Sequence, residues 1–172
     1  MSELLDIADR VVAQAKPGEQ LEAFVSRGGD TEVRVYEGEV EHFVSAQAEG
    51  SGVRVISEGR PGCAYAGTLE DSAVAEVLAE ARDNAQFGTI DEWAGLAEPD
   101  GVEVTDQELW NDELAEYPNV RKIELAKQLE QLTLGVDPRV RIDDSNYADA
   151  YGEAAVATSS GLLQTGRETG CD

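Results

Sequence analysis

Apolar residues near the start of the chain recur every three or four positions, which is the spacing of one face of an α-helix. This pattern predicts a helix over residues 3–16, with Ser2 as its N-terminal cap and Pro17-Gly18 as its stop. The same period predicts helices over residues 71–84 and 119–134. In the last of these, the residues expected to face inward are Ile123, Ala126, Leu129 and Leu132.

Between the first two predicted helices, apolar and polar residues alternate, which is typical of half-buried β-strands. The alternation predicts strands over residues 21–27, 31–37, 40–48, 53–56 and 62–67. Glycine-containing stretches that predict turns separate them, at residues 28–30, 49–52 and 58–61. Further strands are predicted after the third helix, over residues 139–143, 148–158 and 162–165.

The order of helix and strands occurs twice along the chain, and this repetition predicts an α+β fold. We expect two related units, each a helix with an antiparallel sheet, the second of them truncated. The first unit is expected over residues 1–90, an acidic linker or surface loop over residues 91–117, and the start of the second unit over residues 118–172. Because the second copy stops inside a predicted strand, we expect an open sheet edge, with self-association or disorder of the last residues.

The charge balance narrows the classes of partner. The 172 residues include 36 Asp and Glu against 13 Lys and Arg, a formal net charge of −23. Nucleic acids and anionic membranes attract basic surfaces, so the composition argues against both. No apolar run is long enough to span a bilayer, and the acidic N-terminus lacks the basic start of a secretion signal, so we expect a cytoplasmic protein. The acid excess fits either a salt-adapted surface or an acidic face that attracts a basic peptide.

Residues that hold metals or act as nucleophiles are few. The chain has one histidine, His42, and two cysteines, Cys63 and Cys171, without the spacing of a familiar zinc site. His42 lies on a predicted strand with no second ligand type beside it, so we interpret it as a strand residue. Both cysteines are interpreted as small apolar residues packed in a sheet rather than as redox-active thiols.

Two other patterns have structural interpretations as well. Gly50-Ser51-Gly52 leads into a strand rather than a helix, so it is not expected to bind phosphate. Acidic pairs such as Asp143-Asp144 and Asp112-Glu113 arise by chance in so acidic a chain and are expected on a solvated face. The sequence therefore predicts no catalytic, cofactor-binding or metal-binding residue in this chain.

Several short segments together resemble one protein family. Gly52–Ile56 followed by Gly59–Ala66 resembles the glycine-valine-arginine strand and following hairpin of the TldD/PmbA proteins. These are also called modulators of DNA gyrase and are classed as zinc metallopeptidases. Glu39–Phe43, Ala94–Pro99 and Ser159–Thr169 are similar to further family segments, in the family's order. The Ala94–Pro99 stretch looks more like the PmbA (TldE) branch.

The resemblance implies a role without catalysis. In TldD members an HExxxH helix and a later cysteine of the C-terminal half hold zinc, and this chain has neither. PmbA members lack those ligands and act as the inactive partner in a heterodimer. We therefore expect a non-catalytic N-terminal domain that shapes a chamber for unfolded or extended peptides and an interface with a TldD-type subunit, which alone would carry zinc. The alternatives are a binding or regulatory module with no peptidase role and a small carboxylate enzyme.

Overall fold

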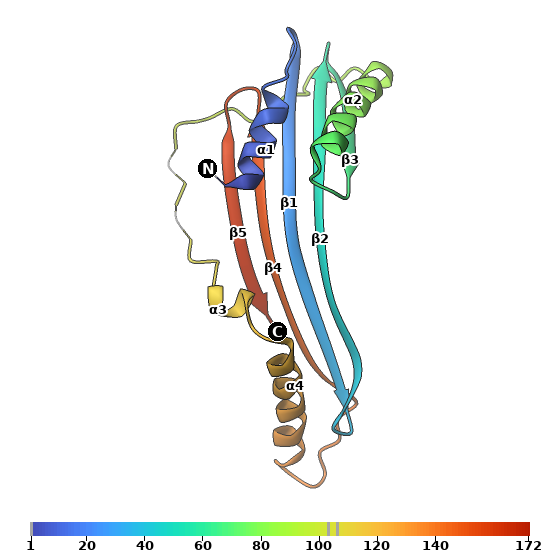
Figure 1. Ribbon diagram of the computed structural model, residues 1–172, viewed down its shortest axis with the longest axis vertical. Helices are drawn as coiled ribbons and strands as arrows, with labels where there is room; N and C mark the ends of the chain where they lie inside the picture. The colour runs from blue at the N-terminus through green and yellow to red at the C-terminus, as the bar shows by residue number, and fades with distance from the viewer. Residues whose placement is uncertain (1, 103, 106) are drawn as a thin grey trace. The chain divides into compact units, whose positions relative to one another are not determined.

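The computed structural model describes residues 2–102, 104, 105 and 107–172. Five strands form one antiparallel sheet in the order β3-β2-β1-β4-β5, and helices accompany it (Figure 1). The strands are β1 (Glu19–Tyr36), β2 (Glu39–Ser57), β3 (Arg60–Ala66), β4 (Ser145–Thr158) and β5 (Leu163–Cys171). The predicted α+β class is thus confirmed. None of the helices in the described part of the chain is long and apolar enough to cross a membrane.

The helices are α1 (Glu3–Val12), α2 (Asp71–Phe87), α3 (Asp112–Ala115) and α4 (Asn119–Leu134). Ser2 caps α1 as predicted, because its Oγ accepts a hydrogen bond from the Leu5 backbone N at 3.2 Å. The helix predicted over residues 3–16 ends earlier, and the one predicted over residues 71–84 runs three residues further. The third predicted helix has the bounds of α4.

The chain folds into two compact units, each built from segments distant in sequence. Unit 1 comprises Met1–Arg27, Ala48–Gln107 and Glu153–Gly166, and unit 2 comprises Gly28–Gln47, Glu108–Gly152 and Arg167–Asp172. The strands of both predicted halves belong to a single sheet. The division of the sequence into residues 1–90, 91–117 and 118–172 stays a prediction.

Unit 1 has an apolar core between its helices and its strands. In Figure 1, α1 and α2 lie against the strands of this unit. The core side chains come from α1, α2 and four strands, and include Leu4, Ala8, Val11, Leu21, Val25, Val53, Val55, Val77, Leu78, Ala81 and Ala157. Gly62 of β3 allows α2 to approach closely, because a Cβ there would overlap backbone atoms of Ala81 and Ala85.

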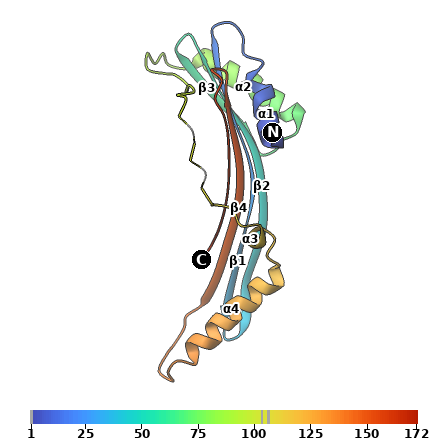
Figure 2. The same ribbon diagram turned by 90° about the vertical axis from the view of Figure 1, so that its left-hand side faces the viewer.

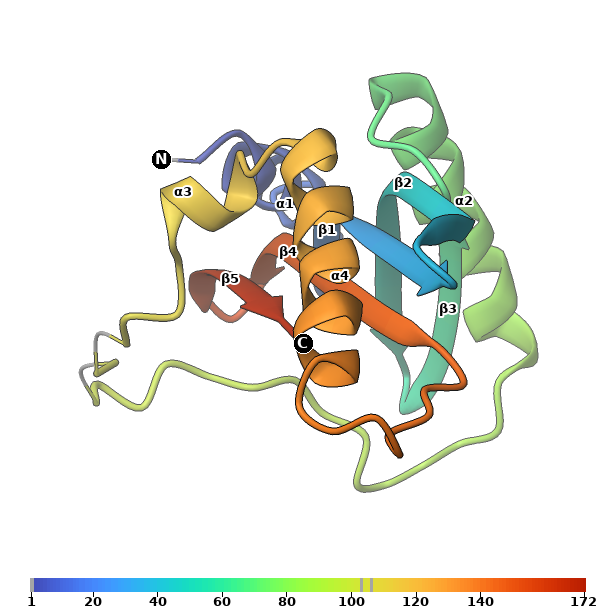
Figure 3. The same cartoon turned by 90° about the horizontal axis from the view of Figure 1, so that it is seen from below.

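Unit 2 has a much smaller apolar cluster, formed by Val33, Val35, Ala126 and Tyr147. Its helix α4 runs beside the strands of this unit (Figure 2), and Figure 3 shows the same helix from below. The residues of α4 that are buried are Lys122, Ala126 and Glu130. The prediction that Leu129 and Leu132 face inward is therefore wrong, since their exposed fractions are 51% and 74%.

Two predicted turns are also wrong. Residues 28–30 lie inside β1, and residues 49–52 lie inside β2. Gly28 and Gly29 do not reverse the chain direction. They allow close packing instead, because a Cβ on either residue would meet atoms of Tyr151. The turn predicted at residues 58–61 is confirmed for Glu58 and Gly59, which have positive φ of 52° and 73°, whereas Arg60 and Pro61 already belong to β3.

The C-terminal strands differ from prediction at both ends. Residues 139–143 are not a strand, because Asp137 accepts hydrogen bonds from the Arg139 backbone N and from its guanidinium and so forms a local turn. The last strand, predicted over residues 162–165, extends to Cys171. Asp172 continues the pairing, exchanging backbone hydrogen bonds of 2.9 and 3.1 Å with Ala148.

Candidate functional site

One stretch of β2, Glu39–Gln47, is exposed at every position, and we call it the open β2 segment. A strand that packs on one face shows alternating burial, so this stretch meets solvent on both faces. β3 pairs with β2 only from Ser51 to Ser57, so in the described part of the chain the open segment has a strand neighbour on one side alone. Its outer backbone N–H and C=O groups are therefore available to an added strand.

The composition of the open β2 segment favours pairing with another strand. Val40, Phe43 and Val44 keep exposed fractions of 37%, 40% and 37%. From His42 to Gln47 the sequence has no Asp, Glu, Lys, Arg or Pro. Uncharged, β-prone runs on an edge associate with other chains unless something covers them. The open β2 segment thus has the properties of a binding strand rather than those of a protected edge.

The hairpin that carries this segment is held by α4. Glu37 and Gly38 take positive φ of 51° and 78° in the turn between β1 and β2, the conformation that a two-residue hairpin turn requires. The Gly38 backbone N donates a 2.7 Å hydrogen bond to Oε2 of Glu130. Glu130 is only 3% exposed, so its carboxylate fixes the tip of the hairpin to the helix.

A buried polar cluster joins α4 to β1 and β4 within unit 2. Lys122 Nζ donates to Asp149 Oδ1 at 2.8 Å and to Thr31 Oγ1 at 3.0 Å. Tyr147 Oη donates to Asp149 Oδ2 at 2.7 Å. Burial, followed by the hydrogen bond to Asp149 and its charge, raises the pKa of Tyr147 far above its usual value. The phenol therefore stays a proton donor across the physiological pH range.

Acidic groups dominate the surface around the open β2 segment. Arg34 lies 3.4 Å from Asp144 and also within ion-pair distance of Glu32 and Glu41. Glu39 faces Lys127 at 3.9 Å. Four carboxylates therefore surround the two cations Arg34 and Lys127 at this surface. The excess of negative charge favours a neutral or basic ligand over an acidic one.

The residues considered from sequence do not converge on a catalytic centre. His42 is exposed on the open β2 segment. Cys63 lies on β3 and Cys171 on β5, but both are free and exposed, so the prediction that they pack in the sheet is wrong. Within the described residues, no group of three or more His, Cys, Asp or Glu side chains could hold a metal ion. Among the described residues there is thus no donor group for zinc, the metal that the resemblance assigns to the TldD-type subunit.

The remaining sequence candidates have structural partners. Ser51, inside β2, donates through Oγ to the Thr68 carbonyl at 3.1 Å. Asp144 pairs with Arg34, and Asp112 accepts a 2.6 Å hydrogen bond from Trp110 Nε1.

The buried cluster of unit 2 is what sequence reasoning missed. Lys122, Ala126 and Glu130 follow each other at four-residue spacing, which places them on one helix face. A helix face with a lysine and a glutamate is usually solvated, so the sequence pattern predicted that the neighbouring leucines are buried instead. The signal that could have corrected this is the presence of buried acceptors and donors on the facing strands, which sequence periodicity does not show.

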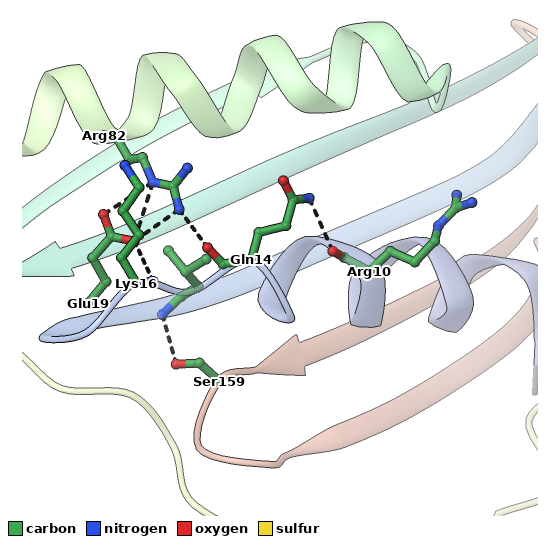
Figure 4. Close-up of polar contacts among 7 residues, drawn as sticks. Arg10, Gln14, Lys16, Glu19, Arg82 and Ser159 are labelled. Atoms are coloured by element: carbon green, nitrogen blue, oxygen red, sulfur yellow. Dashed lines mark hydrogen bonds and ion pairs between the residues drawn. The ribbon is translucent and has the colours of Figure 1, made fainter.

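A second polar cluster ties the start of β1 to α2 in unit 1 (Figure 4). Arg82 Nε and Nη2 donate to Glu19 at 3.0–3.3 Å, and Nη2 also donates to the Gln14 carbonyl at 2.8 Å. Burial by itself would raise the pKa of Glu19, but the hydrogen bonds from Arg82 and the Lys16 backbone, with the charge of Arg82, hold it below its usual value. This cluster supports the fold of unit 1.

Comparisons with known proteins agree with the resemblance seen in the sequence. Residues 21–85 match the family described as PmbA/TldA metallopeptidase domain 1. The chain is 30% identical over 147 residues to "Metalloprotease PmbA" of Escherichia coli O157:H7, an alignment that covers 83% of this chain and 32% of that protein.

Solved structures of other proteins share the fold. TldE from Thermococcus kodakarensis superposes with a TM-score of 0.81 at 22% identity, over 98% of this chain and 36% of that one. A Thermotoga maritima MSB8 protein, provisionally assigned as a modulator of a DNA gyrase, superposes with a TM-score of 0.82 at 18% identity, over 96% of this chain and 37% of that one. The chain thus spans about a third of the length of its relatives. It belongs to the TldD/PmbA family, as an N-terminal domain of that family.

Proposed function

We propose that this chain serves as a non-catalytic N-terminal domain in a TldD/PmbA-like metallopeptidase system. In this role it shapes part of a chamber for peptide substrates and an interface with a TldD-type partner subunit. The observation that carries the proposal is the open β2 segment, which offers both faces and one backbone edge to another chain. The family membership supplies the context of peptide processing or degradation.

The open β2 segment suits an unfolded or extended peptide. A strand that adds to a sheet edge is held mainly by main-chain hydrogen bonds, so such a site accepts many sequences. Val40, Phe43 and Val44 add apolar contacts. The carboxylates around the segment disfavour acidic peptides, so neutral and basic peptides are the preferred class.

The chemistry of cleavage belongs elsewhere in this proposal. A metallopeptidase zinc polarises a water for attack on the peptide carbonyl. The proposal assigns that metal to the C-terminal half of the TldD-type partner, and this chain provides positioning of the peptide backbone alone. We place the protein in the cytoplasm, with peptide and protein partners rather than nucleic acid or membrane.

Proline substitutions in the open β2 segment test the peptide site. Along an edge strand, alternate residues point their N–H groups outward and toward the neighbouring strand. One of the variants Phe43→Pro and Val44→Pro therefore removes a backbone N–H that points away from β1. The other removes an N–H that points toward β1 and so disturbs the pairing of β2 with β1. Fluorescence anisotropy with a labelled neutral octapeptide should show one variant that stays folded but loses binding, and another with reduced stability.

Two threonine variants provide the control. Phe43→Thr and Val44→Thr keep the backbone donors, so both should retain most of the peptide affinity. Equal binding by wild type and both folded proline variants would exclude strand addition here. A peptidase assay with the TldD-type subunit separates the wider alternatives: cleavage that needs both chains and stops with a chelator supports the proposal, and cleavage unaffected by this chain favours a regulatory module.

A further inference from the structure

Strand β5 ends the strand order of the sheet, and one residue on its outer edge already has a backbone partner. Asp172, directly after β5, exchanges both of its backbone hydrogen bonds with Ala148 of β4. Alternate residues of a strand direct their N–H groups to the same side, so the N–H of Thr169 points away from β4. It donates a 2.9 Å hydrogen bond to the Leu109 carbonyl. A segment from outside the sheet thus takes the position of an added strand.

The segment that contacts Thr169 is Leu109–Asn111, which we call the β5 strap. These residues belong to no helix or strand. Besides the bond from Thr169 to Leu109, the Asn111 backbone N donates to Thr169 Oγ1 at 3.0 Å. A neighbouring parallel strand bonds to one residue through two of its own residues in the same way, with a carbonyl in place of the hydroxyl. The β5 strap therefore has the bonding pattern of an added strand at a single residue.

Trp110, at the centre of the β5 strap, contacts side chains from two strands of unit 2. Its ring meets the ring of Tyr151 of β4 edge to face, with 6.5 Å between the centroids and an interplanar angle of 88°. The guanidinium of Arg167 of β5 lies over the indole, its Cζ 4.8 Å from the ring centroid. Both arrangements are attractive. Tyr151 and Arg167 thus form a place for one aromatic side chain beside the edge of β5.

The Tyr151 side of this place is held without help from the β5 strap. A Cβ at Gly29 of β1 would overlap the Tyr151 ring, so the ring lies directly against the backbone of β1. Tyr151 Oη also accepts a 3.0 Å hydrogen bond from Gln47 Nε2 of β2. The ring therefore keeps its position when the strap leaves, and a ligand that replaces the strap has little left to order.

We propose that the outer edge of β5 at Thr169, together with Tyr151 and Arg167, is a binding site for an extended peptide segment that carries an aromatic residue. In the structure, the β5 strap occupies this site and blocks it for other chains. Main-chain hydrogen bonds supply affinity, and the place for the aromatic side chain supplies specificity. The site lies on a different strand from the open β2 segment, so the inference goes beyond the proposed function and is tested independently of it.

The contacts that hold the β5 strap are individually weak. Hydrogen bonds that exchange with water and exposed cation–π pairs each contribute little to stability. Arg167 is exposed, and Trp110 and Thr169 are half-buried. The strap is nevertheless attached to the chain at both ends, so it competes with a free peptide at a high effective concentration. We therefore expect a free peptide to bind well only after the strap has been weakened.

A peptide with the sequence of the strap tests the proposal. Fluorescence anisotropy measures the binding of fluorescein-labelled Gln-Glu-Leu-Trp-Asn-Asp, the sequence of residues 107–112. We expect one site on the Trp110→Ala protein, and binding at least about 10-fold weaker to the wild type, in which the strap occupies the site. A second variant, Asn111→Pro, removes the strap N–H that bonds to Thr169 and leaves the site itself unchanged. It should also bind the peptide more tightly than the wild type.

Matched controls locate the binding. The same peptide with alanine in place of tryptophan should bind at least about 10-fold more weakly to the Trp110→Ala protein. Adding Arg167→Gln should weaken binding at least about three-fold. Adding Arg139→Gln removes an equal charge from a side chain of unit 2 that is 90% exposed, and should change binding by less than about two-fold.

Amide hydrogen exchange identifies the strand that binds. The Thr169 amide should exchange faster in the Trp110→Ala protein than in the wild type, and should slow again when the peptide is added. Equal binding by the wild type and both strap variants would overturn the proposal, as would no binding at millimolar peptide. Binding that ignores the tryptophan of the peptide, or that leaves the Thr169 amide unprotected, would assign the contact to another part of the chain and overturn it as well.

Discussion

The two units of this chain are held together in different ways. In unit 1, helices α1 and α2 place aliphatic side chains such as Leu4, Val11 and Leu78 into a continuous apolar core. In unit 2, α4 buries a lysine, an alanine and a glutamate, and it attaches to the strands through hydrogen bonds to Asp149, Thr31 and Gly38. Apolar burial is non-directional and tolerates small shifts, whereas buried charges require their partners in place.

The difference has a consequence for binding. Both units expose some large apolar residues, but their helices differ, because α1 and α2 of unit 1 bury most of their large aliphatic side chains. In unit 2, polar contacts fix α4 to the strands, and Leu125, Leu129 and Leu132 of this helix stay exposed, as does the open β2 segment. The polar core of unit 2 thus allows an ordered scaffold with two uncovered apolar surfaces.

The largest expected effect lies in the apolar core of unit 1. Gly62→Val should destabilise the protein by more than about 5 kcal/mol, because the new side chain would overlap backbone atoms of α2 that cannot rotate away. Thermal or urea unfolding measures the effect. The control is Gly67→Val, since a Cβ at Gly67 meets nothing within 4 Å and the variant should be nearly neutral. Similar losses for both would mean that α2 does not pack on β3 at Gly62.

The buried ion pair of unit 2 is the next most sensitive place. Asp149→Ala leaves Lys122 buried without its carboxylate and should cost about 3–5 kcal/mol. Amide hydrogen exchange should show the loss mainly in α4 and the strands of unit 2. The double variant Lys122→Met/Asp149→Leu removes both charges and should recover much of that stability.

An exposed pair on the same helix serves as the control for that experiment. Arg121 and Glu124 form a 2.8 Å ion pair with side-chain exposures of 65% and 48%. Glu124→Ala should cost less than about 1 kcal/mol, because exposed pairs are weak. If the buried and exposed variants lost the same stability, the contrast between the two units would rest on apolar packing alone.

Sequence periodicity predicted the elements better than their contacts. The bounds of α4 follow from its leucines and from Pro118, yet those leucines do not face the sheet. Periodicity shows which residues share a helix face, but it does not show which face packs against the sheet. Here Lys122 buries its long apolar stem and donates hydrogen bonds to Asp149 and Thr31. The face of α4 that carries Lys122 therefore packs on the sheet, and the face that carries the leucines does not.

Glycines account for two further errors. Gly28-Gly29 and Gly50-Ser51-Gly52 were expected to be turns and are strand interior. Turn propensity is a local property, but the need for space beside Tyr151 is set by a strand more than a hundred positions away in the sequence. The open β2 segment lies in the strand predicted over residues 40–48, whereas its unpaired edge depends on the reach of β3, which residues 40–48 do not encode.

A smaller effect is expected where α4 holds the β1–β2 hairpin. Glu130→Gln keeps an acceptor for the Gly38 N–H but removes its charge, so the loss should be about 1–2 kcal/mol. Hydrogen exchange of the Gly38 amide should quicken more than that of the strand centres. Glu124→Gln, at an exposed site of the same helix, is the matched control and should leave that amide unchanged.

The smallest expected effect is the pH dependence of the Glu19–Arg82 cluster in unit 1. The pKa of Glu19 in the folded state lies below its model-compound value of 4.5, since the hydrogen bonds from Arg82 and Lys16 outweigh the effect of burial. A lowered folded-state pKa means that the carboxylate stabilises the fold above the unfolded-state value. That contribution, roughly 1 kcal/mol, is lost as the pH falls below about 4.5 and through the folded-state pKa. Urea unfolding of wild type and Glu19→Gln at pH 7 and near pH 3 isolates it from the many other carboxylates. The difference between the two proteins should be larger at pH 7 than near pH 3, whereas a constant difference would show that Glu19 acts by packing and not by charge.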